Sequence, residues 1–321
     1  MVKQYKYELS IIAPMFNEET NVARTFDKLK NGLKDFKGKW ETIFVNDGST
    51  DTTLKKAQDL EAKEKNLKII SYPINMGRGR ALKCGFENAE GKYIVTVDFD
   101  LSYSVEHILK LYTALKEDPM LDMVLASPYM PGGSVENVPP FRLFISKAGN
   151  LILRNSFPKR FHTVTSIMRG YKSEIIKSLD LESDGKEIHL EILAKALGTG
   201  YTCKEVPAVL KGRQRGKSKF RFAKTSFTHI LFSLSERPII IFMLGGIVCL
   251  FLGLILGGYI TYLRFNGILN IRPLIDLVVL LIVIGTQLFS FGILAGQNGV
   301  LRKEIYKLQS RIKKIPEKKD E

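Results

Sequence analysis

Two aspartates at the end of an apolar stretch have a spacing that suits metal chemistry. They lie in Thr96-Val97-Asp98-Phe99-Asp100. In an extended chain, side chains two positions apart point to the same face, so both carboxylates would lie together. A hard divalent cation such as Mg²⁺ binds one or two carboxylates and completes its shell with substrate phosphate oxygens. The pair therefore predicts a metal site for a phosphate-bearing substrate, although a solvated turn after a strand has the same pattern.

Two further polar clusters precede this pair in the chain. Residues 46–51 read Asn-Asp-Gly-Ser-Thr-Asp, which suits a turn whose Ser49 or Thr50 caps the next helix. Residues 75–80 read Asn-Met-Gly-Arg-Gly-Arg, a glycine-rich loop. A dinucleotide-binding fingerprint would need glycine at position 82, where Leu82 stands, so a nicotinamide enzyme is not expected.

The elements that carry these clusters alternate between strand and helix. Apolar residues at spacings of three and four from Val22 to Phe36 indicate a helix, with Asn17 as its expected cap. We expect strands at residues 8–14, 40–45, 67–72, 92–97 and 123–126, and further helices after Thr50, at 79–88 and after Ser104. This α/β alternation predicts a mostly parallel sheet with helices on both faces.

Four consecutive strands of this expected sheet end in polar residues. Residues 14–18 follow the first strand, 46–51 the second, 75–80 the third and 98–100 the fourth. Ligands of open α/β sheets bind at the carboxyl ends of the strands. The sequence therefore predicts one ligand site at one edge of the sheet.

Two long apolar runs occupy the C-terminal part of the chain. We interpret residues 238–263 and 274–296 as transmembrane helices, because crossing a bilayer core takes roughly 20 apolar residues. The expected organisation is a soluble domain at 1–216, an amphipathic interfacial helix at 217–237, the two spans joined by a loop at 264–273, and a basic tail at 297–321.

Basic residues set the expected orientation of these spans. Lysines and arginines are dense before the first span and after the second, whereas the connecting loop holds only Arg264 and Arg272. No signal peptide is visible, and the positive-inside tendency places both termini and the soluble domain in the cytosol, at a cell membrane or endomembrane. Because the net charge of +15 is concentrated beside the spans, we expect membrane lipid rather than nucleic acid as its partner.

Five motifs in order give the chain a family resemblance. APMFNEETNV, FVNDGSTD, NMGRGRALKCGF, VDFDLS and EVPAVLKGRQRGKSKF resemble the inverting glycosyltransferase family two, which has the GT-A fold. Within that family the chain is most similar to dolichyl-phosphate mannose and glucose synthases and to bacterial polyprenyl-phosphate glycosyltransferases. The resemblance covers roughly residues 8 to 225. Two C-terminal spans also fit a common architecture of these enzymes.

The resemblance implies roles for individual residues. Asp98 and Asp100 would hold Mg²⁺ or Mn²⁺ and the donor diphosphate, and Asp100 and Arg213 would carry the catalytic roles. The residues implied to bind the nucleotide sugar are Pro14, Phe16, Glu18, Asp47, Arg78, Asp98 and Asp100. The residues implied to bind the donor or lipid phosphates are Arg142, Arg169, Arg213, Ser218 and Lys219.

Two positions depart from the family pattern. The family often has Ser-Arg-Tyr before its Gly-Gly turn, whereas this chain has Ser127-Pro128-Tyr129. Many relatives also carry an aspartate where Thr163 stands. These differences weaken any assignment of the donor sugar and of a catalytic base.

The expected reaction is inverting transfer of a hexose from a UDP- or GDP-sugar to a polyprenyl or dolichyl phosphate. A processive polysaccharide synthase is disfavoured, because its QxxRW element needs a late tryptophan and the chain has only Trp40. A non-catalytic binding module and transfer to another acceptor are the alternatives. Small-residue spacing at Gly253 and Gly257, and at Gly292 and Gly296, is compatible with a homo-oligomer.

Overall fold

The computed structural model describes residues 4–139, 143, 146, 147, 150, 157, 161–212, 238–266 and 272–313. The chain divides into two units, one of Met1–His229 with Lys307–Glu321 and one of Ile230–Tyr306. Each unit is described by itself.

The first unit alternates strands and helices along the chain. Its strands are β1 (Tyr7–Met15), β2 (Trp40–Asp47), β3 (Leu67–Tyr72), β4 (Gly91–Thr96), β5 (Met123–Ser127), β6 (Ser134–Glu136), β7 (Arg169–Lys172), β8 (Cys203–Pro207) and β9 (Val209–Lys211). Its helices are α1 (Val22–Gly32), α2 (Thr53–Glu61), α3 (Arg78–Asn88), α4 (Val105–Glu117), α6 (Ser173–Ser178) and α7 (Ile188–Gly198). All five strands expected from the sequence are confirmed, as are the helices between them.

Seven of these strands form one mixed sheet in the order β3-β2-β1-β4-β7-β5-β8. Neighbouring strands are parallel except around β7, which runs antiparallel to both β4 and β5. The prediction of a mostly parallel α/β sheet is therefore confirmed. Strand β7 was not expected from the sequence; its chain segment returns between two strands that precede it in sequence.

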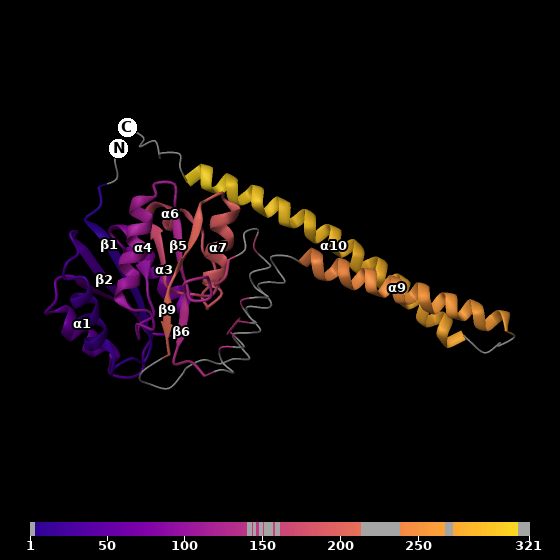
Figure 1. Ribbon diagram of the computed structural model, residues 1–321, viewed down its shortest axis with the longest axis horizontal. Coiled ribbons are helices and arrows are strands. Elements are labelled where there is room, and N and C mark those ends of the chain that lie inside the picture. The colour runs from indigo at the N-terminus through magenta and orange to yellow at the C-terminus, as the bar shows by residue number, and fades with distance from the viewer. Residues whose placement is uncertain are drawn as a thin grey trace. The chain divides into compact units, whose positions relative to one another are not determined.

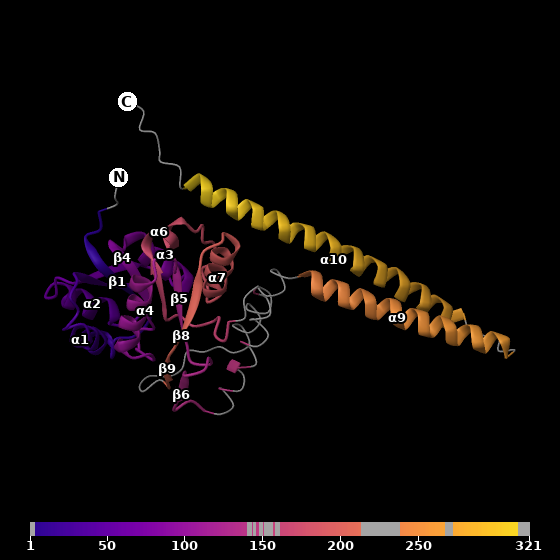
Figure 2. The ribbon, with the colours of Figure 1, turned by 45° about the horizontal axis from the view of Figure 1, so that its top comes forward.

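Helices cover both faces of this sheet (Figures 1 and 2). One face packs side chains of β1 against α1 and α4 in a continuous apolar cluster that includes Phe26 and Phe44. On the other face α3 approaches β1 so closely that a Cβ at Gly85 would lie 2.4 Å from Cγ2 of Ile12. Burial on both faces explains why the strands are nearly continuous apolar runs.

A histidine joins the start of α4 to the small two-stranded sheet of β6 and β9. The Nε2 atom of His107 accepts the N–H of Val209 at 3.0 Å, so its Nδ1–H donates to Oγ of Ser104 at 2.8 Å. Burial lowers the pKa of His107, and the nearby Lys110 and Lys211 act in the same direction, against the hydrogen bond to Ser104 and the charge of Glu106. The neutral ring is therefore part of the folded structure.

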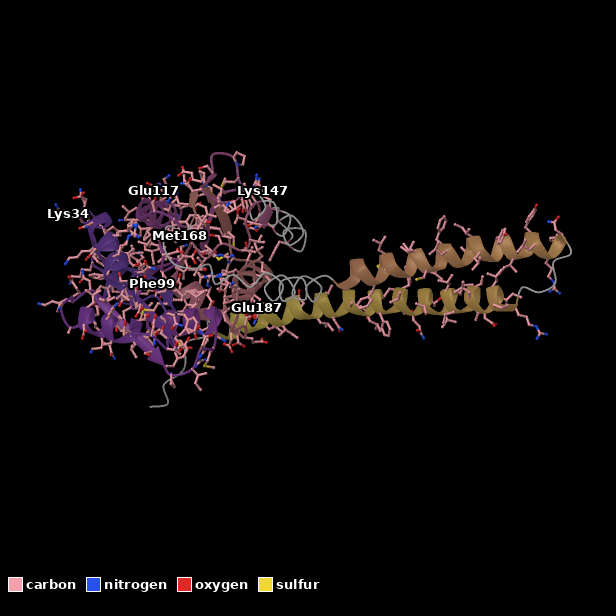
Figure 3. The ribbon with its side chains drawn as sticks, turned by 90° about the horizontal axis from the view of Figure 1, so that it is seen from below. Lys34, Phe99, Glu117, Lys147, Met168 and Glu187 are labelled. Atoms are coloured by element: carbon pink, nitrogen blue, oxygen red, sulfur yellow. The ribbon has the colours of Figure 1, made fainter. Side chains whose placement is uncertain are left out.

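The second unit holds α9 (Pro238–Phe265), which packs antiparallel against α10 (Arg272–Lys313), a helix that extends past this unit's end (Figure 3). Within them, Phe242–Phe265 and Arg272–Leu301 are long and apolar enough to cross a membrane. A Cβ at Gly246 would lie 2.8 Å from the Gly285 carbonyl oxygen, so these glycines permit close contact between the backbones. Gly253 of α9 also packs against α10. The small-residue spacing noted in the sequence included Gly253 but not Gly246.

The His107 link predicts a pH dependence of stability. The pKa of His107 is lower in the folded protein than its ordinary value of 6.5, so neutral His107 stabilises the fold above that value. This contribution is lost as pH falls through the lower folded-state pKa. We expect the free energy of unfolding of the detergent-solubilised chain to fall between about pH 7.5 and pH 5, and to fall less for His107→Gln. Urea denaturation at both pH values measures this, and equal pH dependence of the two proteins would contradict it.

Candidate functional site

The carboxyl ends of β1, β2, β3 and β4 meet at one edge of the sheet. Strand β1 lies between β2 and β4; the chain continues from β1 to β2 on one side and from β4 to β5 on the other, so the strand order reverses between β1 and β4. Such a switch in strand order opens a crevice where ligands of α/β sheets bind. The expected position of the site therefore agrees with the topology.

The loop after β1 is tied to the loop after β2 by hydrogen bonds. The N–H of Asn17 donates to Oγ of Ser49 at 2.9 Å, and the N–H of Thr50 donates to Oδ1 of Asn17 at 2.8 Å. Asn17 has a φ of 52°, a left-handed conformation that asparagine tolerates. The expectation that Asn17 caps α1 is wrong, because Asn21 occupies that position and Asn17 instead joins the two loops.

The carboxylate of Asp47 accepts a group of hydrogen bonds from the loop between β3 and α3. Its donors are the N–H groups of Met76 and Gly77, at 2.8 and 3.0 Å, the amide of Asn75 at 2.9 Å and the hydroxyl of Tyr72 at 2.9 Å. Burial and the Asp47 carboxylate raise the pKa of Tyr72, which keeps this hydroxyl a donor. Asp47 is 5% exposed and holds this loop in place. Contact of Asp47 with a base or ribose stays a prediction.

The remaining residues expected to contact the nucleotide lie at the end of β1. Pro14 and Phe16 are partly buried. Glu18 is 9% exposed, its N–H donates to Oγ1 of Thr53 at 2.8 Å, and its carboxylate accepts from Nδ2 of Asn21 at 2.7 Å. These residues therefore share the sheet edge with Asp47, and their contact with a donor stays a prediction.

The turn after β4 presents both expected metal-binding aspartates. Asp98 and Asp100 are partly buried. Phe99 between them, labelled in Figure 3, is 5% exposed. Its ring packs edge-on against Phe44, with 4.8 Å between ring centroids. The carbonyl oxygen of Phe99 accepts the hydroxyl of Thr25 at 2.7 Å, which fixes the turn to α1. Phe99 thus anchors the turn that carries the two aspartates to the core.

Both carboxylates have partners in this arrangement. Nη2 of Arg78 lies 3.2 Å from Oδ1 of Asp98, and these side chains are 34% and 25% exposed. Oδ1 of Asp100 accepts the N–H and the hydroxyl of Ser102 at 3.0 and 2.6 Å. The ion pair joins the start of α3 to Asp98, and Asp100 follows two residues later in the same turn.

This pair of carboxylates fits a divalent cation whose shell a ligand completes. Among the described residues, no group of three or more His, Cys, Asp or Glu side chains could hold a metal ion. Two carboxylates with phosphate oxygens and water are nevertheless a normal set for Mg²⁺. The site therefore suits a metal that binds together with a diphosphate.

Arg169 does not lie where a phosphate could reach it. Its side chain is fully buried, and its guanidinium donates to the carbonyl oxygens of Ser166, Val164 and His189 at 2.7, 2.6 and 2.6 Å. These bonds tie β7 to the preceding segment and to α7, so we correct the expected phosphate contact to a structural role. The other expected phosphate-binding residues, Arg142, Arg213, Ser218 and Lys219, lie outside the described residues.

The departure at Thr163 belongs to a buried polar cluster. Its hydroxyl lies 2.8 Å from that of Ser127, the residue before Pro128, and its N–H donates to Oε1 of Glu205 at 2.8 Å. Thr163 is 3% exposed. Thr163 therefore joins the segment before β7 to β5 through a hydroxyl–hydroxyl bond, and to β8 through its backbone N–H and the Glu205 carboxylate.

Several residues that support the site were not predicted from the sequence. Ser102 follows Asp100 by two positions, a local turn pattern that could have been recognised. Tyr72 reaches Asp47 because the two residues are paired across parallel strands, so only the strand register reveals it. Thr25 has no comparable signal, since its partner Phe99 is far along the chain.

Comparisons with known proteins agree with this geometry. The sequence model of the family described as Glycosyl transferase family 2 matches residues 10–180. A dolichol-phosphate mannosyltransferase of Pyrococcus furiosus is 33% identical over 226 residues, 70% of this chain and 62% of that protein. The chain thus spans about three fifths of that relative's length. A dodecaprenyl-phosphate galacturonate synthase of Rhizobium johnstonii is 28% identical over 306 residues, 90% of this chain and 86% of that protein.

Solved structures show the same fold. A glucosyl-3-phosphoglycerate synthase of Mycobacterium tuberculosis, in complex with Mn²⁺, UDP and glucosyl-3-phosphoglycerate, superposes with a TM-score of 0.54 at 20% identity. The match covers 72% of this chain and 80% of that chain. The same enzyme in complex with Mg²⁺ and UDP gives a TM-score of 0.53. The first unit therefore has the GT-A fold.

The Asp47 contacts predict that this residue contributes to stability without any ligand. Replacement by asparagine removes the charge and one acceptor, and hydrogen bonds to a charged group contribute about 2 kcal/mol. We expect Asp47→Asn to lower the free energy of unfolding by about 2 kcal/mol. Urea denaturation without donor measures this, with Asp59→Asn on the exposed side of α2 as the matched control. Equal stability of Asp47→Asn and the control would show that the loop does not depend on this carboxylate.

Proposed function

The chain belongs to glycosyl transferase family 2, and from this premise we propose that it transfers a hexose from a UDP- or GDP-sugar to a polyprenyl or dolichyl phosphate. The transfer inverts the anomeric carbon and takes place at the cytosolic face of a membrane. The single observation that carries the proposal is the ion pair of Arg78 and Asp98 at the switch in strand order, with Asp100 two residues further along the same turn.

The names of similar proteins support a lipid phosphate as acceptor. Relatives include a dolichol-phosphate mannosyltransferase, a dodecaprenyl-phosphate galacturonate synthase and a polyprenol monophosphomannose synthase of Mycolicibacterium smegmatis. The sugars in these names differ, so the similarity supports a lipid-phosphate acceptor more than a particular sugar donor. The two apolar helices support the same acceptor, because a polyprenyl tail stays in the bilayer and the enzyme must come to it.

The chemistry requires little from a catalytic base. A phosphate monoester has a second pKa of about 6, so the acceptor oxygen is already largely anionic at neutral pH. This oxygen forms a bond to the anomeric carbon, while the bond from that carbon to the donor diphosphate breaks on the opposite side. Thr163, neutral and buried where relatives often have a carboxylate, is compatible with such an acceptor.

The difficult part of the reaction is the departure of the nucleoside diphosphate. Asp98 and Asp100 would hold Mg²⁺ or Mn²⁺, which when bound supplies Lewis-acid stabilisation of the charge on the leaving group. Arg78 donates to Asp98 in this structure and would donate to the diphosphate when the donor is bound. Basic residues that follow β9, with Arg213 first among them, would orient the acceptor phosphate.

The proposed topology follows from the basic residues that flank the two helices. The first unit and both termini would face the cytosol, and the short connection around residues 264–273 would face outward. The first helix would be entered through an interfacial segment at 217–237, which lies outside the described residues. This arrangement brings the site to the membrane face where nucleotide sugars are available.

The metal-binding roles predict a loss of transfer on substitution. We expect Asp100→Ala and Asp98→Asn to lower kcat by about 100-fold or more, because each removes a charge that supports the leaving group. Full-length protein in detergent is incubated with radiolabelled UDP- or GDP-sugars and dolichyl or undecaprenyl phosphate, with Mg²⁺, with Mn²⁺ or with chelator. Asp59→Ala serves as control, because Asp59 is exposed on α2.

Formation of a lipid-phosphate sugar that requires metal and Asp100 would identify donor and acceptor together. Transfer that chelator and Asp100→Ala leave unchanged would disprove the metal roles. Binding of nucleotide sugar with no transfer to either lipid phosphate would point to a binding module or to another acceptor.

A further inference from the structure

The segment between α6 and α7 closes the start of α3, the helix that begins with Arg78. The carbonyl oxygen of Asp184 accepts the N–H groups of Gly79 and Arg80 at 2.7 and 3.2 Å. The first turn of a helix leaves its N–H groups without partners inside the helix. The carbonyl oxygen of Asp184 thus accepts two of these N–H groups, which could otherwise donate to a phosphate.

The glycines of the loop allow this segment to come close. A Cβ at Gly79 would lie 2.3 Å from the carbonyl oxygen of Ser183, and a Cβ at Gly77 would lie 2.5 Å from that of Asp184. Gly77 also has a φ of 105°, which residues with a side chain rarely adopt. The glycine pattern that resembles a phosphate loop is therefore explained by contact with residues 183–184.

A buried carboxylate on α7 holds this segment in its conformation. Oε1 of Glu191 accepts the N–H of Glu182 and Oε2 accepts that of Ser183, both at 2.8 Å. Glu191 is 5% exposed. Burial alone would raise the pKa of Glu191, but the hydrogen bonds from Lys195 and from these N–H groups outweigh it and lower the pKa. Glu191 therefore carries its charge in the folded protein.

Lys195 completes this buried cluster. Its Nζ lies 2.7 Å from Oε1 of Glu191 and also donates to the carbonyl oxygen of Asp180. Lys195 is 6% exposed, which is unusual for lysine unless it is paired. From the other side, Lys83 of α3 binds the carboxylate of Asp184 at 2.7 Å. The segment is thus held by charged side chains of α7 and of α3.

Arg78 lies between the two glycines that contact this segment. Its backbone is therefore fixed on both sides, while its guanidinium reaches Asp98 at 3.2 Å. A shift of residues 183–184 away from α3 would release the first turn and move Arg78 relative to the aspartate pair. The contacts run without interruption from Glu191 through residues 182–184 and the start of α3 to Arg78.

We propose that Glu191 and Lys195 are positioning residues of the nucleotide-sugar site. They hold residues 182–184 against α3 and so set the place of Arg78 beside Asp98. Neither residue touches the donor. The inference rests on the proposed function for its effect on donor binding, whereas its effect on α3 can be measured without any turnover.

The test compares Glu191→Gln with a matched variant at another carboxylate. Asp122→Asn is the control, because Asp122 also accepts a backbone N–H, from Thr202 at 2.9 Å, and pairs with a lysine, Lys172 at 3.4 Å. It lies before β5, outside the donor cluster. Full-length protein in detergent is used, with amide hydrogen exchange, titration with UDP and GDP, and the KM for the donor as readouts.

We expect Glu191→Gln to speed exchange of the Gly79 and Arg80 amides by about 10-fold or more. It should also weaken binding of the nucleoside diphosphate by about 10-fold, as substitution of an outer-shell partner does at metal sites. The KM for the donor should rise accordingly, and the KM for the lipid phosphate should stay unchanged. Asp122→Asn should change none of these, although both variants lower stability.

The proposal is overturned if Glu191→Gln and Asp122→Asn give the same exchange at Gly79 and Arg80 and the same nucleotide affinity. If Glu191→Gln does not fold, Gly79→Ala separates residues 183–184 from α3 without touching the buried pair, and unchanged nucleotide affinity there overturns the proposal equally. Failure of the wild type to transfer sugar or bind nucleotide would count against the proposed function, and the exchange result at α3 would still decide whether Glu191 positions this helix.

Discussion

The carboxylate of Asp47 holds the end of β2 against the loop between β3 and α3. Two backbone N–H groups and the side chains of Tyr72 and Asn75 donate to it, so the loop has one conformation before any ligand binds. Arg78 follows this loop directly, and its guanidinium meets Asp98 at the end of β4. By holding this loop, the buried Asp47 carboxylate therefore also sets the place of Arg78 beside Asp98. The preorganised arrangement of charges in the site depends on this contact.

Buried polar contacts support the site from the other half of the sheet as well. Arg169 joins β7 to α7 through three carbonyl oxygens, and Glu191 on α7 holds the segment that closes α3. Each of these charged groups is almost fully buried, and each forms several hydrogen bonds with the described residues. Groups of this kind are costly to bury unless they are paired, so a substitution that leaves one partner behind should disturb the local structure strongly. The sheet supplies the frame, and these buried charges set where its loops lie.

The sequence predicted what depends on local pattern and spacing. The five parallel strands, the apolar helices and the polar strand ends follow from periodicity, and the structure confirms them. It could not predict β7, because the chain order does not reveal that a late segment inserts antiparallel between β4 and β5. Arg169 was misread because arginine is seldom fully buried, and its three carbonyl partners come together only in the tertiary structure. Helix α10 also continues to Lys313, beyond the transmembrane span expected at 274–296. The basic residues that follow the apolar run thus belong to the same helix.

The charges at the crevice bear on how donor and metal would bind under the proposed function. Arg78 neutralises Asp98 in this structure, and Asp100 adds a second carboxylate nearby. A divalent cation alone would place positive charge beside the Arg78 guanidinium, whereas a diphosphate alone would place negative charge beside two carboxylates; both arrangements are repulsive. If both were bound, Asp98 and Asp100 would hold the cation, and Arg78 would have the diphosphate as a partner in place of Asp98. Under the proposed function, metal and donor would therefore bind together more readily than either one alone, and Arg78 would stay paired with Asp98 until both bind.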